Sequence, residues 1–597
     1  MTSPIKENGS VWLARGLETA LAAIVGVVLA LMLALVLLAV VLRYVFGTGL
    51  IGTEDLGIWL NVALISLAAP LAMSGPLAMR LDLPLGPRTQ SISRVVADAV
   101  SLIAAFVLAF GSARVVALIG GASPTLGVPE WVRFAVTGTG GALIAVILVL
   151  RRIGERQFPS LAVSAGLAGL ISLACLRMNL ATALPASAAI ALFAAIGLIA
   201  AAPLAHAFLA AALVAMPFGG NLAPETMVTT AVSGMSHFLL LAIPFFLLTG
   251  TALSASGAAA HLVAFAASLV GHRRGGLAQT VLATGTLFSG ASGSSVANAV
   301  FSATTFQPEL TRRGYPPARA GAIIAASSVL DNVIPPSIAF LILAAATDLS
   351  VGKLLVGGLF AGLVMAASLA IAIHLTTRDQ PGGERASPGE RKRTFLAAVP
   401  AFGLGIIVVV GIRIGIVTTT EAAALAAAYT LALAAFSKTR RTPLFSIFRQ
   451  TAVEAAAIGL LIGSAGPFAF QLAIDGVAGM LSSAAGALGG SPAAILAFCV
   501  AVLLAAGLVL DIGAAILLFG PLLLPLAAGA GLDPIAFGVI VVTTLMIGGL
   551  TPPVGMLVLV VGGVATIPAA ALFRAVLPYL AALVSAVALI CAFTLLI

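Results

Sequence analysis

The stretch VIPPSI at residues 333–338 places two adjacent prolines inside an apolar segment, and GGLTPPVG at residues 548–555 does so again. The two pairs differ by a constant offset in residue number, since 552 − 335 and 553 − 336 both equal 217. A Pro-Pro pair removes two backbone donors and clashes with the preceding turn, so it breaks a helix. Lipid cannot satisfy the carbonyl oxygens that the break frees, so the break must face protein or a cavity. Paired interrupted segments are typical of the binding site of a secondary transporter.

Other turn-forming residues recur at the same offset, which indicates an internal duplication. The matching positions are Pro308, Gly314 and Pro317 in the first copy and Pro525, Gly531 and Pro534 in the second. We predict repeats at about 181–376 and 394–597. Between them, residues 376–393 are rich in glycine, proline and charge, which predicts a solvated cytoplasmic loop.

Small polar stretches precede each Pro-Pro pair, at residues 290–298 and 510–515. Adding 217 to the position of Ser294 gives Asp511, so the two stretches occupy equivalent places. Glycine permits a tight turn, and we predict that each stretch forms the tip of a re-entrant hairpin. An ionisable residue such as Asp511 in an apolar run is a functional candidate. The alternative is a hydrogen bond that joins two helices.

The composition indicates that lipid surrounds most of the chain. Of its 597 residues, 61% are hydrophobic and 8% are charged, whereas soluble domains carry about 25% charged residues. The apolar runs are long and lack period-2 alternation. We therefore predict an all-α polytopic protein in a lipid bilayer. The net charge of +9 sits in short loops, as the positive-inside rule requires, and does not indicate nucleic-acid binding.

The first 157 residues form a separate region. Apolar runs predict helices near 16–42, 56–75, 95–120 and 132–151. Successive loops alternate between basic and acidic residues, and the N-terminal segment and the segment after the fourth helix are both basic. Basic segments face the cytoplasm, which places both the N-terminus and residue 157 there. The first apolar run is too long for a signal peptide and lacks a cleavage site, so we expect it to be retained.

Several motifs resemble those of the tripartite ATP-independent periplasmic (TRAP) transporters, in the form whose small and large membrane subunits are fused. Small-subunit motifs are RYVFGTG (43–49), TEDLGIWL (53–60) and LGVPEW (126–131). Large-subunit motifs include LLLAIPFFLLTG (239–250), GHRRGGLA (271–278), FSGASGSSVAN (288–298), TTTEAAALAAAY (418–429) and LDPIAFG (532–538), together with both Pro-Pro stretches.

The resemblance implies a four-helix small-subunit domain at 1–157, a connecting transmembrane segment at 158–180 and a transport domain at 181–597. It also implies an inverted-repeat, elevator-type importer in the bacterial inner membrane. Sodium would be the coupling ion, and a periplasmic substrate-binding protein would deliver an organic acid anion. No Gly-x-x-x-x-Gly-Lys-Ser/Thr motif is present, so use of ATP is not expected.

The resemblance also implies the site residues. Those expected to bind substrate are Ser294, Ser295, Asn298, Ser337 and Asp511. Those expected to bind sodium are Ser292, Asp331, Ile334 and Pro336 in the first half and Gly548, Thr551 and Pro553 in the second. The chain departs from the family pattern at three positions, where the usual residues are Asp, Gly and Asn; here they are Asn298, Asp331 and Thr544.

Two other functions remain as alternatives. A binding-protein-independent dicarboxylate/sodium symporter uses similar hairpins, but the fused four-helix region argues against it. The residues Gly290-Ala291-Ser292-Gly293 match the motif of intramembrane serine proteases. A nucleophilic serine needs an adjacent base, and the only histidine after Ser292 is His374, beside the polar linker. We therefore expect no enzymatic activity.

Overall fold

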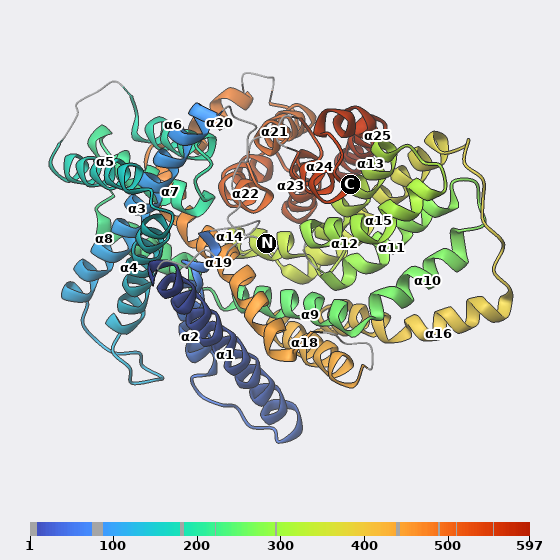
Figure 1. Cartoon of the computed structure of the whole chain (residues 1–597), viewed down its shortest axis with the longest axis horizontal. Coiled ribbons are helices and arrows are strands. Elements are labelled where there is room, and N and C mark those ends of the chain that lie inside the picture. The colour runs from blue at the N-terminus through green and yellow to red at the C-terminus, as the bar shows by residue number, and fades with distance from the viewer. Residues whose placement is uncertain are drawn as a thin grey trace, which may run out of the picture. The chain divides into compact units, whose positions relative to one another are not determined.

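The computed structural model describes residues 9–73, 87–178, 184–220, 222–292, 295–437, 442–486, 490–508, 510–552 and 555–596. Within these ranges the regular structure is helical, apart from one isolated β-bridge between Ala122 and Pro129 (Figure 1). Eleven of the described helices are long and apolar enough to cross a membrane. The predicted all-α polytopic fold is confirmed. Contacts divide the chain into two units, residues 1–244 with 448–479 and residues 245–447 with 480–597.

The first unit contains the helices of the N-terminal region and several that follow. These are α1 (Gly9–Val45), α2 (Thr53–Ala68), α3 (Pro87–Leu118), α4 (Trp131–Gly154), α5 (Phe158–Arg177), α6 (Ala186–Ile199), α7 (Leu204–Val214), α8 (Pro224–Met235) and most of α19 (Leu444–Ile474). Helices α1–α4 lie over the four predicted helices. Helix α5 covers the run for which a connecting segment is expected, although the predicted domain boundaries themselves stay a prediction.

Two adjacent glycines of α4 explain how three helices of this unit pack closely. A Cβ atom at Gly140 would lie 2.2 Å from the carbonyl oxygen of Ser66 in α2, and one at Gly141 would lie 2.8 Å from the backbone nitrogen of Ala109 in α3. Larger residues would therefore push the helices apart. Small residues at such crossings are the usual basis of helix association in membranes.

The second unit contains the duplicated segments. Its helices are α10 (Ala258–Val270), α11 (Gly276–Ser292), α12 (Ser295–Arg312), α13 (Pro317–Ser328), α14 (Ile338–Thr347), α15 (Val351–Thr376), α16 (Pro388–Gly405), α17 (Gly411–Arg413), α18 (Thr419–Phe436), α21 (Pro492–Gly507), α22 (Ile512–Gly529), α23 (Pro534–Gly548), α24 (Met556–Ala565) and α25 (Ala569–Leu596). Helices α9 (Ala242–Ser256) and α20 (Val477–Gly486) cross the boundaries of the units.

Five consecutive helices of this unit occur twice in register. Helices α11 to α15 form one series and helices α21 to α25 form the other. The first residue numbers of corresponding helices, such as Ser295 of α12 and Ile512 of α22, differ by the offset of the prolines or by one more or less. Each of the five α-helices of one series therefore has a partner in the other. This agreement supports the duplication that the prolines and glycines predict.

The recurring glycines and prolines produce the same turn in both series. Gly314 and Gly531 have φ angles of 88° and 83°, in the left-handed region that glycine adopts without strain. Each follows a helix whose end carries the paired hydrogen bonds of a Schellman motif, with distances of 3.0 and 3.1 Å in both series. Pro317 and Pro534 then begin the next helix, where a missing N–H costs nothing.

The two series also pack against each other reciprocally. Helix α12 packs on α24, and its counterpart α22 packs on α14. Each hairpin thus rests its second arm on the segment that follows the Pro-Pro break of the other series. The two breaks and the two hairpins consequently belong to one packed assembly within the second unit.

The prediction of a solvated loop at residues 376–393 is wrong for residues 388–393, which are helical. Helix α16 begins at Pro388, and the Ser387 hydroxyl caps it by accepting a hydrogen bond of 3.1 Å from the backbone N–H of Glu390. A serine before Pro and three positions before Glu is a helix-start signal, which the charge of the segment obscured. The first part is tied to the α10–α11 turn, because the Gly383 N–H donates to the Gly271 carbonyl at 2.9 Å.

Candidate functional site

The first Pro-Pro pair interrupts the chain between α13 and α14. In a continuous helix the nitrogens of Pro335 and Pro336 would face the carbonyls of Asp331 and Asn332, one helical turn earlier. Proline has no N–H, so neither carbonyl receives that hydrogen bond. The Asn332 carbonyl instead accepts a hydrogen bond from the Ser337 hydroxyl. The predicted break is therefore present, and it lies directly after the short 3₁₀ turn Val329–Asn332.

The second pair produces the same situation after α23. Here the carbonyls that lose their donors to Pro552 and Pro553 belong to Gly548 and Gly549. The Gly549 carbonyl accepts from the Leu557 N–H at 3.0 Å. The Gly548 carbonyl accepts from the N–H and the hydroxyl of Thr551, at 3.1 and 3.0 Å. Both freed carbonyls thus accept hydrogen bonds from nearby donors of the same segment.

Position 548 is too crowded for any side chain. A Cβ atom there would lie 2.3 Å from the carbonyl oxygen of Gly507, at the end of α21. The equivalent residue of the first series is Asp331, since 548 − 331 = 217, and its side chain is fully buried. The first series therefore holds a carboxyl group where the second brings two backbones together.

The hairpin tips are only partly described. The structure describes neither Ser294 nor Pro553, and Ser292 only by its backbone, as the last residue of α11. Ser295 begins α12, and Asn298 lies one turn further. Both side chains are buried, with 3% and 1% of their surface exposed.

Several buried polar atoms of the second unit have no hydrogen-bond partner among the residues that the structure describes. They are the Ser295 and Ser327 hydroxyls, the Asn298 Nδ2 amide and the Thr544 hydroxyl. The Asn298 Oδ1 atom accepts from the Ser302 hydroxyl at 3.2 Å, so only the donor side of this amide is unused. A buried donor without a partner costs about 1–3 kcal/mol, so each such group calls for an explanation, and a bound ion or ligand is one of them.

Ser327 is a candidate that the sequence reasoning missed. It is the counterpart of Thr544, because 544 − 327 = 217, and both hydroxyls are buried and unused within the described ranges. Each lies one helical turn before a predicted ion-binding residue, Asp331 or Gly548. Subtracting the repeat offset from Thr544, already notable as a departure from the family pattern, would have found it.

Asp511 caps helix α22. Its Oδ2 atom accepts a hydrogen bond of 2.9 Å from the Gly513 N–H, and the positive end of the helix dipole favours a carboxylate there. This bond lies within one hairpin and does not join two helices. Asp511 and its capped helix thus form the described part of the second hairpin tip.

The other predicted site residues lie at the two breaks. Ile334 and Pro336 are buried, and the Ser337 hydroxyl both donates to Asn332 and accepts from the Phe340 N–H at 3.3 Å. Thr551 is half-buried and bonds Gly548 as described above. Nothing in these contacts tests the predicted roles of these residues, which stay predictions.

The groups around the breaks fit a hard cation better than a transition metal. They offer carboxyl, hydroxyl and carbonyl oxygens, which small hard cations prefer, and the named residues include no imidazole or thiolate. The buried hydroxyls of Ser327 and Thr544 add two further oxygens that need a partner. The amide of Asn298 and the hydroxyl of Ser295 are uncharged donors that suit an anionic oxygen.

Comparison with known proteins matches two family models to separate parts of the chain. The model of the DctM component of the tripartite ATP-independent periplasmic transporter matches residues 188–596, and that of the DctQ component matches residues 32–158. The isethionate TRAP transporter permease protein DctMQ of Oleidesulfovibrio alaskensis is 30% identical over 548 residues, covering 89% of this chain and 85% of the relative.

Two large permease proteins are similar to the C-terminal part. The C4-dicarboxylate protein DctM of Pseudomonas aeruginosa is 36% identical and covers 58% of this chain and 82% of the relative. The 2,3-diketo-L-gulonate protein YiaN of Escherichia coli is 33% identical and covers 60% of this chain and 86% of the relative. The DctM match alone spans more than half of the chain. This protein therefore belongs to the TRAP transporter family, as a permease that joins the DctQ and DctM components in one polypeptide.

Proposed function

We propose that this permease is the membrane component of a sodium-coupled importer of organic acid anions. A periplasmic substrate-binding protein delivers the substrate, and the chain lies in the bacterial inner membrane with its N-terminus in the cytoplasm. The observation that carries the proposal is the set of buried donors and hydroxyls, unused among the described residues, beside two register-matched helix breaks.

The substrate class follows from the donors and from the relatives. Isethionate, C4-dicarboxylates and 2,3-diketo-L-gulonate, which the relatives' names specify, are all organic anions with several oxygens. The Asn298 Nδ2 atom and the Ser295 hydroxyl have unused hydrogens to donate to such oxygens. Ser294, Ser337 and Asp511 complete the proposed substrate contacts.

Sodium would bind at the two breaks. The first site would take oxygens of Ser292, Asp331, Ile334 and Pro336, and the second those of Gly548, Thr551 and Pro553. Because the Gly548 carbonyl already accepts two hydrogen bonds from Thr551, and a carbonyl has two lone pairs, ion binding there requires the Thr551 turn to open. The second site would therefore couple ion binding to a local rearrangement.

An elevator movement of the second unit would carry substrate across the membrane. Both hairpins and both breaks belong to this unit, whereas the N-terminal helices belong to the other. Helices α14 and α24 have 10 residues each. At about 1.5 Å per residue they are about 15 Å long, roughly half of a hydrocarbon core of about 30 Å. Helices of this length would end inside the bilayer. The substrate site that an elevator movement carries would lie at that depth.

The deciding experiment is uptake into proteoliposomes that contain the full chain. A candidate periplasmic binding protein is loaded with a labelled organic acid and added outside. We expect uptake that requires both the binding protein and an inward sodium gradient. Uptake that ignores the sodium gradient would refute the coupling, and uptake without any binding protein would favour the independent symporter.

Ion binding is measured separately from transport. A ligand that binds only the folded state raises the unfolding temperature. We expect sodium, but not potassium at equal ionic strength, to stabilise the purified permease. The isosteric variant Thr544→Val and the variant Ser327→Ala remove one hydroxyl each, and both should reduce the sodium-dependent rise. An unchanged rise in both variants excludes these hydroxyls from the ion sites.

A further inference from the structure

The first unit contains a polar cavity. Its volume is about 530 Å³, which falls within the range of pockets for small ligands. One wall is a single face of α3, which contributes Gln90, Ser93, Arg94 and Asp98 at helical spacing. The end of α4, the residue before α5 and the turn between α6 and α7 form the other walls.

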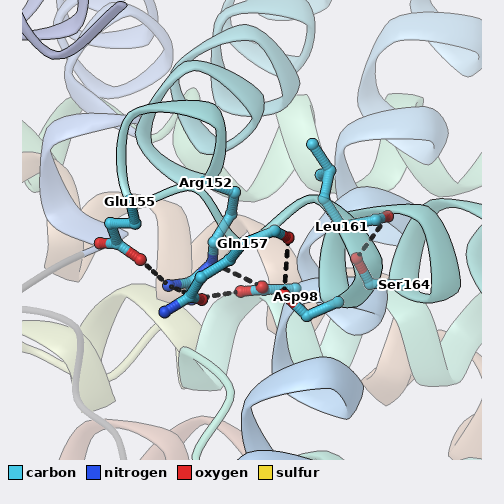
Figure 2. Close-up of polar contacts among 7 residues, drawn as sticks. Asp98, Arg152, Glu155, Gln157, Leu161 and Ser164 are labelled. Carbon is cyan, nitrogen blue, oxygen red and sulfur yellow. Dashed lines mark hydrogen bonds and ion pairs between the residues drawn. The ribbon is translucent and has the colours of Figure 1, made fainter. Parts of the chain in front are cut away.

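Arg152 binds both carboxylates of this cavity (Figure 2). Its Nε and Nη2 atoms bind the two oxygens of Asp98 at 2.7 and 2.8 Å, and its Nη1 atom binds Glu155 at 2.7 Å. Asp98 is buried, and both of its oxygens are engaged. A bidentate arginine pair of this kind is geometrically fixed. Arg152 therefore offsets one of the two carboxylate charges and occupies both oxygens of Asp98.

Other described polar groups of the cavity do not bind Asp98 or Glu155. The Gln157 Oε1 atom accepts from Arg152 at 3.4 Å, which turns the amide so that its NH₂ group is the remaining polar end. Arg151 is paired with Glu18 at 2.7 Å. Arg94 lines the cavity, and within the described part of the chain it forms no ion pair. Arg94 thus offers a guanidinium group that no ion pair among the described residues occupies.

We propose that this cavity binds a phosphate group, with Arg94 as its principal ligand. A guanidinium group pairs with phosphate through two parallel N–H bonds, and basic pockets between membrane helices bind lipid head groups. The amide of Gln157 and the side chain of Gln90 would supply neutral donors. The phosphate could come from a phospholipid or from a free phosphorylated solute, which share this chemistry.

Two exposed apolar side chains belong to residues that are sequence neighbours of lining residues. Ile199 is 59% exposed beside the lining residue Ala200, and Phe158 is 56% exposed beside Gln157. A phospholipid would place its phosphate on Arg94 and its chains along these side chains. A free phosphate would use only the polar part of the cavity.

The test measures phosphate binding to the purified full-length permease after removal of its lipids. One arm titrates phosphatidylglycerol and counts bound lipids by native mass spectrometry; the other titrates inorganic phosphate by calorimetry. Arg94→Gln should weaken binding about ten-fold, the effect of losing one charge-assisted contact. Arg94→Lys, which keeps the charge but not the fork, should weaken it less. Arg88→Gln is the matched control, because Arg88 is exposed on the same helix and does not line the cavity.

Each outcome decides the proposal. Selective loss of lipid binding in Arg94→Gln identifies a lipid head group, and selective loss of inorganic phosphate binding identifies a free phosphate. Loss of both supports the shared chemistry. Equal binding by Arg94→Gln and Arg88→Gln, with unchanged thermal unfolding, would show that the cavity is only a polar packing defect and would overturn the proposal.

Discussion

The two helix series of the second unit have the same geometry and different chemistry. The Schellman turns at Gly314 and Gly531 and the proline starts of α13 and α23 occupy equivalent positions in the two series. The side chains at other matched positions are not equivalent. Asp331 matches Gly548 and Asn298 matches Ala515, since 548 − 331 and 515 − 298 both equal 217.

This difference shows which residues maintain the fold and which could carry function. Glycine and proline at the turns are kept in both series because the backbone geometry requires them. Carboxyl and amide groups are present at these two positions of the first series alone, so the shared fold does not require them there.

The largest effect is expected from Gly548→Ala. The new Cβ atom would lie 2.3 Å from the Gly507 carbonyl oxygen, and two backbones cannot move apart as a flexible side chain can. Overpacking of this kind costs about 1–3 kcal/mol, and here we expect the upper end. Thermal unfolding of the purified permease measures it. Gly563→Ala is the control, because that helical glycine has open space around its Cβ position and alanine favours a helix. Equal stability of the two variants would refute the close approach of α21 and α23.

Asp331→Asn should produce the largest functional change with little structural change. Asparagine has the same shape but no charge, so a cation bound by this carboxylate would lose about 1.5–3 kcal/mol. That corresponds to a roughly ten- to hundred-fold higher sodium requirement, measured as the sodium dependence of uptake.

The control for this change is Asp533→Asn, an exposed cap of α23 at which asparagine caps as well as aspartate does. Equal sodium dependence in both variants would remove the Asp331 side chain from the ion site. The two proposed sodium sites would then both depend on carbonyl and hydroxyl oxygens.

How far the sequence predicts this structure depends on the scale of the feature. The prolines and glycines predict both breaks and the register of the helices, because these residues act through their own backbone. The contact of Gly507 with Gly548 and the pairing of Arg152 with Asp98 join residues that are distant in sequence. No local pattern encodes such contacts, and a single sequence therefore does not predict them.

The start of α16 escapes prediction for a different reason. Its Ser-Pro-x-Glu signal is local and visible in the sequence, but the surrounding charge and glycine favour a loop. The predicted site residues rest mainly on family resemblance. Asn298 and Ser295 are found buried with donors unused among the described residues, which gives those predictions a physical basis that the sequence could not supply.

Asn298→Ala should separate function from stability. The change gives the first series the alanine of the second, and it removes a buried Nδ2 donor that has no partner among the described residues. Stability should stay the same or rise by up to about 1 kcal/mol, because the desolvation cost of that donor disappears. Uptake should fall about ten-fold in kcat/KM if the donor binds the substrate anion. Loss of stability together with activity would instead assign Asn298 a packing role through its bond to Ser302.

The smallest effect is expected at Asp511, where two variants separate a helix cap from a ligand. Asp511→Asn keeps a side-chain acceptor for the Gly513 N–H, whereas Asp511→Ala removes the cap and should cost about 1 kcal/mol. Asp511→Asn loses the charge at the helix N-terminus, which should lower stability by about 0.3–1 kcal/mol. If Asp511 also contacts substrate or ion, the loss of about 0.5–1 kcal/mol from a weakened hydrogen bond would make uptake about two- to five-fold slower. If both variants transport normally at normal expression, Asp511 serves only to begin α22. The polar chemistry described at the hairpin tips would then lie in the first series alone, and the asymmetry between the two series would be greater than their sequences indicate.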